Sequence, residues 1–147
     1  MLSTAHNVKI IKKHIPNTNN CTYINCVSID CVFTKESLFF FTHQKNIEAH
    51  FSEQNPKLGQ IIKYKNIYNL FIKHQQSQKA HEDYGTYLKN LKQTLETVKN
   101  EMIKSKENNL VILKNACGID KGSWPDALKI IFDIFRNTEI NVFICTK

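Results

Sequence analysis

The residues best suited to chemistry lie at positions 114–120, Lys-Asn-Ala-Cys-Gly-Ile-Asp, directly after the apolar run 111–113. An apolar strand that stops at a small-residue turn before a helix places that turn at the carboxyl edge of a sheet. In open α/β folds this edge is where ligands bind. Backbone N–H groups beside a helix start suit an anion such as a phosphate. The stretch therefore predicts an anion-binding turn, with Asp120 as the only carboxylate near the bound group.

The bulk composition predicts one folded domain of 147 residues, because hydrophobic residues make up 41% of the chain and charged residues 22%. No apolar run is long enough to cross a membrane, and the polar segment 1–7 lacks the apolar core of a secretory signal. Five cysteines, an odd number, then favour free thiols in a reducing compartment, the cytoplasm or the nucleus. Cys21, Cys26 and Cys31 stand five apart, which matches no zinc pattern, so we expect no metal and no cofactor.

The net charge of +7 favours anionic partners. The 20 basic residues are spread over the whole chain without a dense run. The charge therefore supports RNA only weakly, and we treat RNA as an alternative partner.

Hydrophobic periodicity predicts strands that alternate with helices. The expected strands are 8–11, 22–29, 60–64, 67–72, 110–113 and 140–144. The expected helices are 36–53, 83–104 and a last one that Ser123 caps. The second strand is largely apolar and should be central, and Lys65-Asn66 should join the third and fourth strands tightly. This order implies a mixed sheet covered by helices.

The two later helices carry apolar stripes at helical spacing. The stripe of the first consists of Tyr84, Tyr87, Leu88, Leu91, Leu95, Val98 and Met102, and that of the second of Ala127, Leu128, Ile131, Ile134 and Phe135. The opposite face of the first helix holds Lys89, Lys92, Glu96 and Lys99. We interpret that face as solvated rather than as a nucleic-acid patch.

Three motifs in the same order resemble macro domains, and within them the branch that removes terminal ADP-ribose from protein glutamates. Residues 113–120 with Trp124 are similar to that branch's second ligand loop. Residues 25–31, Asn-Cys-Val-Ser-Ile-Asp-Cys, resemble its segment at the end of the second strand, and residues 67–73 resemble its lysine-bearing strand. The resemblance runs from about position 8 to the last residue. It implies a single domain, 1–147, with a three-layer α/β/α macro-domain-like fold and a mixed central sheet.

The resemblance also implies a function, which is recognition of ADP-ribose, of a related nucleotide or of an ADP-ribosylated protein. The reaction that it implies is hydrolysis of the ADP-ribosyl ester. The implied ligand-binding residues are Ser28, Asp30, Cys31, Lys114, Asn115, Ala116, Cys117, Gly118 and Ile119. In this branch a lysine attacks the anomeric carbon of the distal ribose, and an aspartate of the second loop acts as acid and base. By position, Asp120 is that aspartate, and a carboxylate suits the role.

The chain departs from the branch at the nucleophile. Two adjacent lysines end the corresponding strand in the branch, and the second one attacks, whereas here the pair is Lys73-His74. An imidazole cannot form the adduct that an amine forms, so two interpretations of His74 stay open: a catalytic general base, or a polar residue at the end of the strand. Neighbours in an extended strand point to opposite faces, so Lys73 could replace the nucleophile only with a bulge or a one-residue shift.

Two further departures concern binding. Residues 32–38 contain no glycine where the family usually has a glycine-rich phosphate loop, and Ile10-Ile11 stand where it commonly has an adenine-binding aspartate. Two alternatives follow. One is a catalytically inactive, degenerate macro domain that binds a different nucleotide-like ligand. The other is a protein or RNA interaction module.

Overall fold

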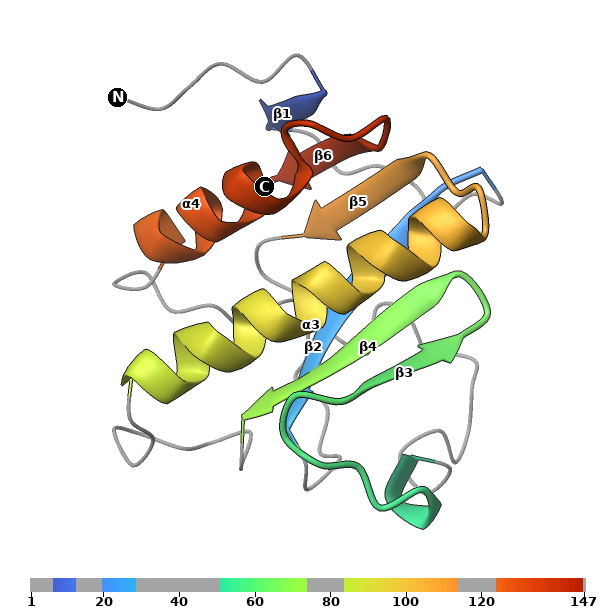
Figure 1. The fold of residues 1–147 in the computed structure, drawn as a ribbon, viewed down its shortest axis with the longest axis vertical. Coiled ribbons are helices and arrows are strands. Elements are labelled where there is room, and N and C mark those ends of the chain that lie inside the picture. The colour runs from blue at the N-terminus through green and yellow to red at the C-terminus, as the bar shows by residue number, and fades with distance from the viewer. Residues whose placement is uncertain (1–6, 13–19, 29–50, 74–83, 114–123, 147) are drawn as a thin grey trace.

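The computed structural model describes residues 7–12, 20–28, 51–73, 84–113 and 124–146, which form one α/β unit (Figure 1). The strands are β1 (Val8–Ile11), β2 (Thr22–Ser28), β3 (Ile61–Tyr64), β4 (Ile67–Lys73), β5 (Asn109–Leu113) and β6 (Asn141–Cys145). Two helices, α3 (Tyr84–Lys104) and α4 (Trp124–Phe135), lie within the described residues. Each boundary lies within a residue or two of the sequence prediction. The expected helix 36–53 and the cap at Ser123 fall largely outside the described residues, which include only the helical turn 51–53.

The six strands form one sheet in the order β1-β6-β5-β2-β4-β3. Every neighbouring pair is parallel except β3–β4, which is antiparallel and joined by the two residues Lys65 and Asn66. The predicted mixed sheet, the tight connection and the central place of β2 are confirmed. A parallel sheet buries both faces of its inner strands, and β2 shows this, because six successive residues, 22–27, are buried.

Helices α3 and α4 lie on the same face of the sheet (Figure 1). The expected apolar stripes face inward: the buried members are Leu91, Leu95, Val98 and Met102 of α3 and Ala127, Ile131, Ile134 and Phe135 of α4. Alternate strand residues pack against them, among them Ile24, Leu70 and Ile112. Each fully buried side chain of this size contributes roughly 1.5–3 kcal/mol of hydrophobic stabilisation.

The opposite face of the sheet carries a second apolar cluster. Its buried members are Tyr23, Val27, Phe51, Ile62, Ile67, Phe71, Val111, Leu113 and Cys145. The rings of Phe51 and Phe71 meet edge to face with centroids 5.8 Å apart, so the turn 51–53 packs directly on β4. A mixed sheet with apolar clusters on both faces confirms the expected fold class.

Helix α3 ends in a Schellman motif. The Glu107 N–H donates to the Met102 carbonyl (2.9 Å) and the Lys106 N–H to the Ile103 carbonyl (3.2 Å). Lys106 has φ of 58°. This is the left-handed conformation that glycine normally supplies, so a lysine holds it at some conformational cost.

The exposed face of α3 is solvated as predicted, with Lys89, Lys92 and Glu96 all exposed. Cys26 and Cys145 are buried free thiols and Cys21 is a half-buried one, while Cys31 and Cys117 lie outside the described residues. No helix in the described part of the chain is both long and apolar enough to cross a membrane.

Candidate functional site

The carboxyl ends of five parallel strands meet at one edge of the sheet. The ends of β4 and β5 lie on the same side of the molecule as the first turns of α3 and α4 (Figure 1). A helix N-terminus carries about half a positive elementary charge and unpaired N–H groups. Two such termini beside one sheet edge make this edge the natural place for an anionic ligand.

This edge is stepped. Ile11 pairs with Cys145 and Cys145 with Leu113, so β1 and β6 end level with Leu113, the last described residue of β5. Ile24 pairs with Ile112, which puts Leu113 level with Asn25. Strand β2 then runs on for three more residues to Ser28, and β4 runs beside it. At about 3.3 Å per residue, β2 and β4 reach roughly 10 Å beyond the level at which β1 and β6 end.

The two strands that precede the segments singled out by the sequence are placed next to each other. Residues 114–120 continue from β5 and residues 29–31 from β2, and these two strands are direct neighbours. Of the predicted site residues, the structure describes only Ser28 and Lys73, at the ends of β2 and β4. Asp30, Cys31, His74, Lys114, Asn115, Ala116, Cys117, Gly118, Ile119 and Asp120 lie outside the described residues. Their assigned roles therefore stay predictions.

The β2–β4 ladder is irregular where the candidate site begins. Val27 pairs with Phe71, but Ser28 pairs with Lys73, so Ile72 is the extra residue on β4. An extra residue bends a strand and re-aims the residues that follow it. Lys73 could replace the missing second lysine only with a bulge or a one-residue shift, and β4 contains such a bulge directly before Lys73.

A buried amide pair stands at the foot of the step. The Asn25 side-chain N–H donates to Oδ1 of Asn69 (3.0 Å), and the Asn69 side-chain N–H donates to the Ile62 backbone carbonyl (3.0 Å). Both side chains are fully buried. The pair links β2, β4 and β3 just below the projecting strand ends. Sequence analysis missed it, although two asparagines within otherwise apolar strands were the available sign.

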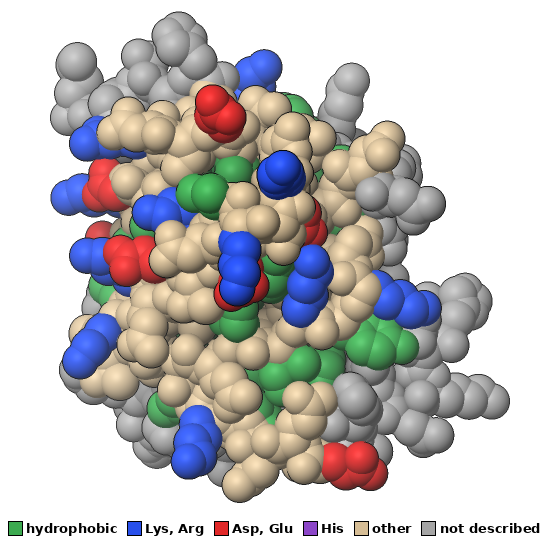
Figure 2. Space-filling view, turned by 45° about the vertical axis from the view of Figure 1, so that its right-hand side comes forward, with side chains coloured by type: hydrophobic (Ala, Val, Ile, Leu, Met, Phe, Trp, Pro, Cys, Tyr) green, Lys and Arg blue, Asp and Glu red, His purple; other side chains and the backbone are tan. Residues whose placement is uncertain are grey.

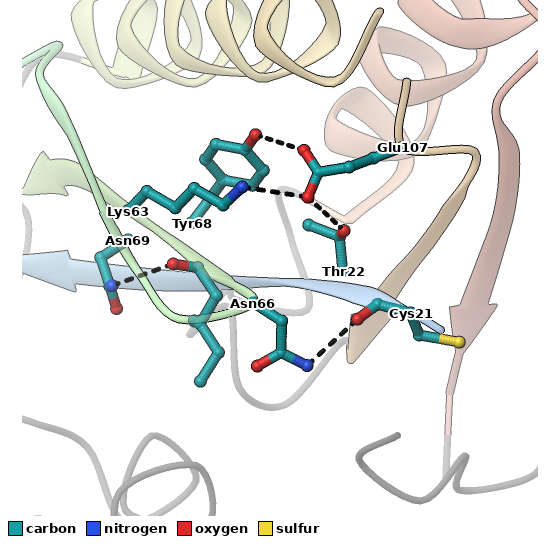
Figure 3. Close-up of polar contacts among 8 residues, drawn as sticks. Cys21, Thr22, Lys63, Asn66, Tyr68, Asn69 and Glu107 are labelled. Carbon is teal, nitrogen blue, oxygen red and sulfur yellow. Dashed lines mark hydrogen bonds and ion pairs between the residues drawn. The ribbon is translucent and has the colours of Figure 1, made fainter. Parts of the chain in front are cut away.

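A second polar cluster lies at the opposite, amino edge of the parallel strands (Figure 3). The Tyr68 hydroxyl donates to Glu107 Oε2 (2.8 Å), while Lys63 Nζ and the Thr22 hydroxyl each donate to Oε1 (3.0 Å). Partial burial alone would raise the pKa of Glu107, but the hydrogen bonds from Lys63, Tyr68 and Thr22 outweigh it and lower this pKa below its usual value. Burial, then the hydrogen bond to Glu107, raises the pKa of Tyr68. The cluster fastens the end of α3 to three strands, far from the candidate site.

Known proteins with similar sequences or folds were found by comparison. No protein-family model matches the chain. It is 27% identical over 127 residues to the ADP-ribose glycohydrolase OARD1 of Bos taurus, a match that covers 84% of this chain and 80% of that protein. The macrodomain of Thermus aquaticus DarG has the same fold, with a TM-score of 0.75 at 12% identity over 95% of this chain and 98% of the other. The chain is a macro domain. Its homology to OARD1 is distant but extends over most of its length.

Another matching structure is a complex with a ligand. Thermosipho africanus DarTG, in complex with ADP-ribose, matches this macro domain with a TM-score of 0.71 at 12% identity. The match covers 95% of this chain and 41% of the DarTG chain. The family resemblance predicted from three sequence motifs is therefore confirmed, and the chain is related to ADP-ribose glycohydrolases.

Two surface hollows are lined by residues in the described part of this macro domain. One, of about 260 Å³, lies between α3 and α4 and is lined by Leu88, Lys92, Asp126, Lys129, Ile130, Asp133 and Ile134. The other, of about 320 Å³, lies beside the end of α3. Basic and acidic side chains are interspersed on the face seen in Figure 2. The described residues contain no group of three or more potential metal ligands.

Proposed function

We propose that this macro domain binds ADP-ribose at the stepped carboxyl edge and hydrolyses the ester that joins ADP-ribose to a protein glutamate. One observation carries the proposal: β2 and β5 are parallel neighbours, so the segments that contain Asp30 and Asp120 leave adjacent strands at the same edge of the sheet. The relationship to OARD1, named as an ADP-ribose glycohydrolase, supports the same activity.

In this proposal, the backbone amides of residues 114–119 bind the diphosphate. The first turn of α4, which starts at Trp124, adds a favourable dipole. Ser28, Asp30 and Cys31 line the end of the pocket that holds the distal ribose. The projecting ends of β2 and β4 then form one wall of the pocket, and the ends of β5, β6 and β1 form its floor.

The reaction needs a nucleophile and a proton carrier. We assign attack on the anomeric carbon to the Lys73 amine, which forms a C–N bond while the C–O bond to the glutamate carboxylate breaks. Asp120 takes the proton that the amine loses and later assists the water that releases ADP-ribose from the lysine. The register shift between Val27 and Ser28 supports Lys73 over His74, because it re-aims β4 at this point.

The test measures binding and turnover separately. Calorimetry with ADP-ribose should give a Kd in the micromolar range, and a substrate protein carrying ADP-ribosyl glutamate should be cleaved. Asp120→Asn should lower kcat by at least a hundredfold while ADP-ribose still binds. Asp133→Asn, which removes an exposed carboxylate from α4, is the matched control. Unchanged turnover in Asp120→Asn would remove the acid/base assignment.

A second candidate function is a binding module without catalysis. His74 at the position of the usual nucleophile and the absence of glycine from residues 32–38 favour it. This candidate predicts ADP-ribose binding with no release of ADP-ribose from substrate protein by the wild type. No binding at millimolar ligand would argue against both candidates.

A further inference from the structure

The floor of the step ends in an apolar row. Ile11, Cys145 and Leu113 are matched in register across β1, β6 and β5 and all pack in the second-face cluster. Leu113 is 5% exposed and Cys145 1% exposed, whereas Ile11 is only half-buried. Ile11 is therefore the member of the row that a ligand can reach.

The position of this row relates it to the proposed ligand. Strands lie about 4.8 Å apart, so the four steps from β4 to β1 span roughly 19 Å. With the distal ribose at the end of β4 and the diphosphate over β5, an extended ADP-ribose carries its base towards the ends of β6 and β1. This placement of the base rests on the proposed function.

The described residues at this end include no charged acceptor that could hydrogen-bond to the amino group of adenine. They are Ile11, Lys12, Cys145 and Thr146, and none of them is a carboxylate. The Thr146 N–H donates to the Ile11 carbonyl (3.0 Å), and the Thr146 hydroxyl points to the same oxygen (3.4 Å). An apolar side chain beside occupied backbone groups favours contact with the face of a base over hydrogen bonding to its edge.

We propose that Ile11 is the base-contacting residue of the pocket and that the pocket does not select adenine by its amino group. The ligand class then widens from ADP-ribose to nucleoside diphosphate riboses with other purines. In a macro domain built this way, affinity comes from the diphosphate and the riboses, while the base contributes apolar area.

The test compares two ligands that differ at the base edge: ADP-ribose and its hypoxanthine analogue, inosine diphosphate ribose. We expect calorimetric Kd values within about threefold of each other, because no hydrogen bond to the amino group is lost. A site that accepts a hydrogen bond from adenine would discriminate by about tenfold or more. Ile11→Ala should raise the Kd of both ligands by a similar factor of about three to ten, because it removes an apolar contact that both ligands make.

A gain-of-selectivity variant sharpens the result. Ile11→Asp places an acceptor at the base and should make ADP-ribose bind at least fivefold tighter than the inosine analogue. Ile10→Asp is the matched control, because Ile10 is 48% exposed and alternates to the other face of β1; its ligand ratio should equal that of the wild type. The melting temperature of each variant shows whether it is folded. If Ile11→Ala does not fold, Ile11→Val replaces it.

The outcomes separate this inference from the proposed function. If the wild type binds neither ligand at millimolar concentration, the proposed function is wrong and the inference falls with it. If ADP-ribose binds tenfold tighter than the inosine analogue, the proposed function stands and the inference is overturned. If folded Ile11 variants bind both ligands as the wild type does, Ile11 does not contact the base.

Discussion

Ser28 at the end of β2 pairs with Lys73 of β4, although an unbroken register from Val27 and Phe71 would pair it with Ile72. The extra residue falls just before the position where macro domains of the related branch carry their attacking lysine. Parallel bulges are rare, and bulges often lie next to active sites, where they re-aim a side chain. The proposal that Lys73 supplies the attacking amine rests on this irregularity of the backbone.

We predict that Lys73→Ala lowers turnover of ADP-ribosyl glutamate by at least a hundredfold while calorimetry still detects ADP-ribose. Reductive trapping with cyanoborohydride, followed by mass spectrometry, should locate the sugar adduct on Lys73. Lys99→Ala, a change of the same charge on α3, serves as control.

The opposite outcome is equally specific. If Lys73→Ala turns over as the wild type does and His74→Lys raises the rate, the reactive position is 74 and the register shift has no catalytic meaning.

The element order and the helix faces could be predicted because they follow from local periodicity. Leu91, Leu95 and Val98 recur at helical spacing, and all three are buried. The step in the sheet edge could not be predicted. It depends on how far β2 projects beyond its neighbour β5, and this is set by the register between Ile24 and Ile112, residues far apart in sequence.

The polar clusters escaped prediction for a related reason. Glu107 follows a helix and looks like an ordinary solvated residue, yet its partners Thr22, Lys63 and Tyr68 come from three strands that precede it by 39 to 85 positions. Only the folded sheet brings these groups together. The predicted roles of the residues after β2 and β5 rest on the family resemblance, which extends beyond the described residues.

Acid should weaken the fold through Glu107. Its pKa is lower in the folded protein than in the unfolded chain, so its stabilising contribution is complete above pH 5 and is lost as the pH falls through the folded value. Urea unfolding should show the free energy of unfolding falling between about pH 5 and pH 3. Glu107→Gln should lower the free energy of unfolding by about 1 kcal/mol at pH 7 and make it depend less steeply on pH in this acid range. An acid slope equal to that of the wild type would assign acid lability to other carboxylates.

The buried Asn25–Asn69 pair should show energetic coupling. Asn25→Leu alone strands a buried acceptor on Asn69 and should lower the free energy of unfolding by about 2–3 kcal/mol. The double variant Asn25→Leu/Asn69→Leu should cost less than the sum of the single variants by about 1 kcal/mol or more. Asn100→Leu, on the exposed face of α3, is the matched control and should stay within about 0.5 kcal/mol of the wild type. Strict additivity at positions 25 and 69 would show that the hydrogen bond contributes nothing.

Lys106→Gly should stabilise the protein by about 0.5–1 kcal/mol. Lys106 holds φ of 58° at the left-handed position of the Schellman motif, and glycine adopts this conformation without the steric penalty of a Cβ. Lys104→Gly is a matched control, because it removes the same charge two residues earlier, within the last turn of α3. There glycine should destabilise by about 1 kcal/mol. Thermal or urea unfolding of the two variants should therefore give shifts of opposite sign. Destabilisation by both would mean that the Lys106 side chain contributes more than its backbone strain costs.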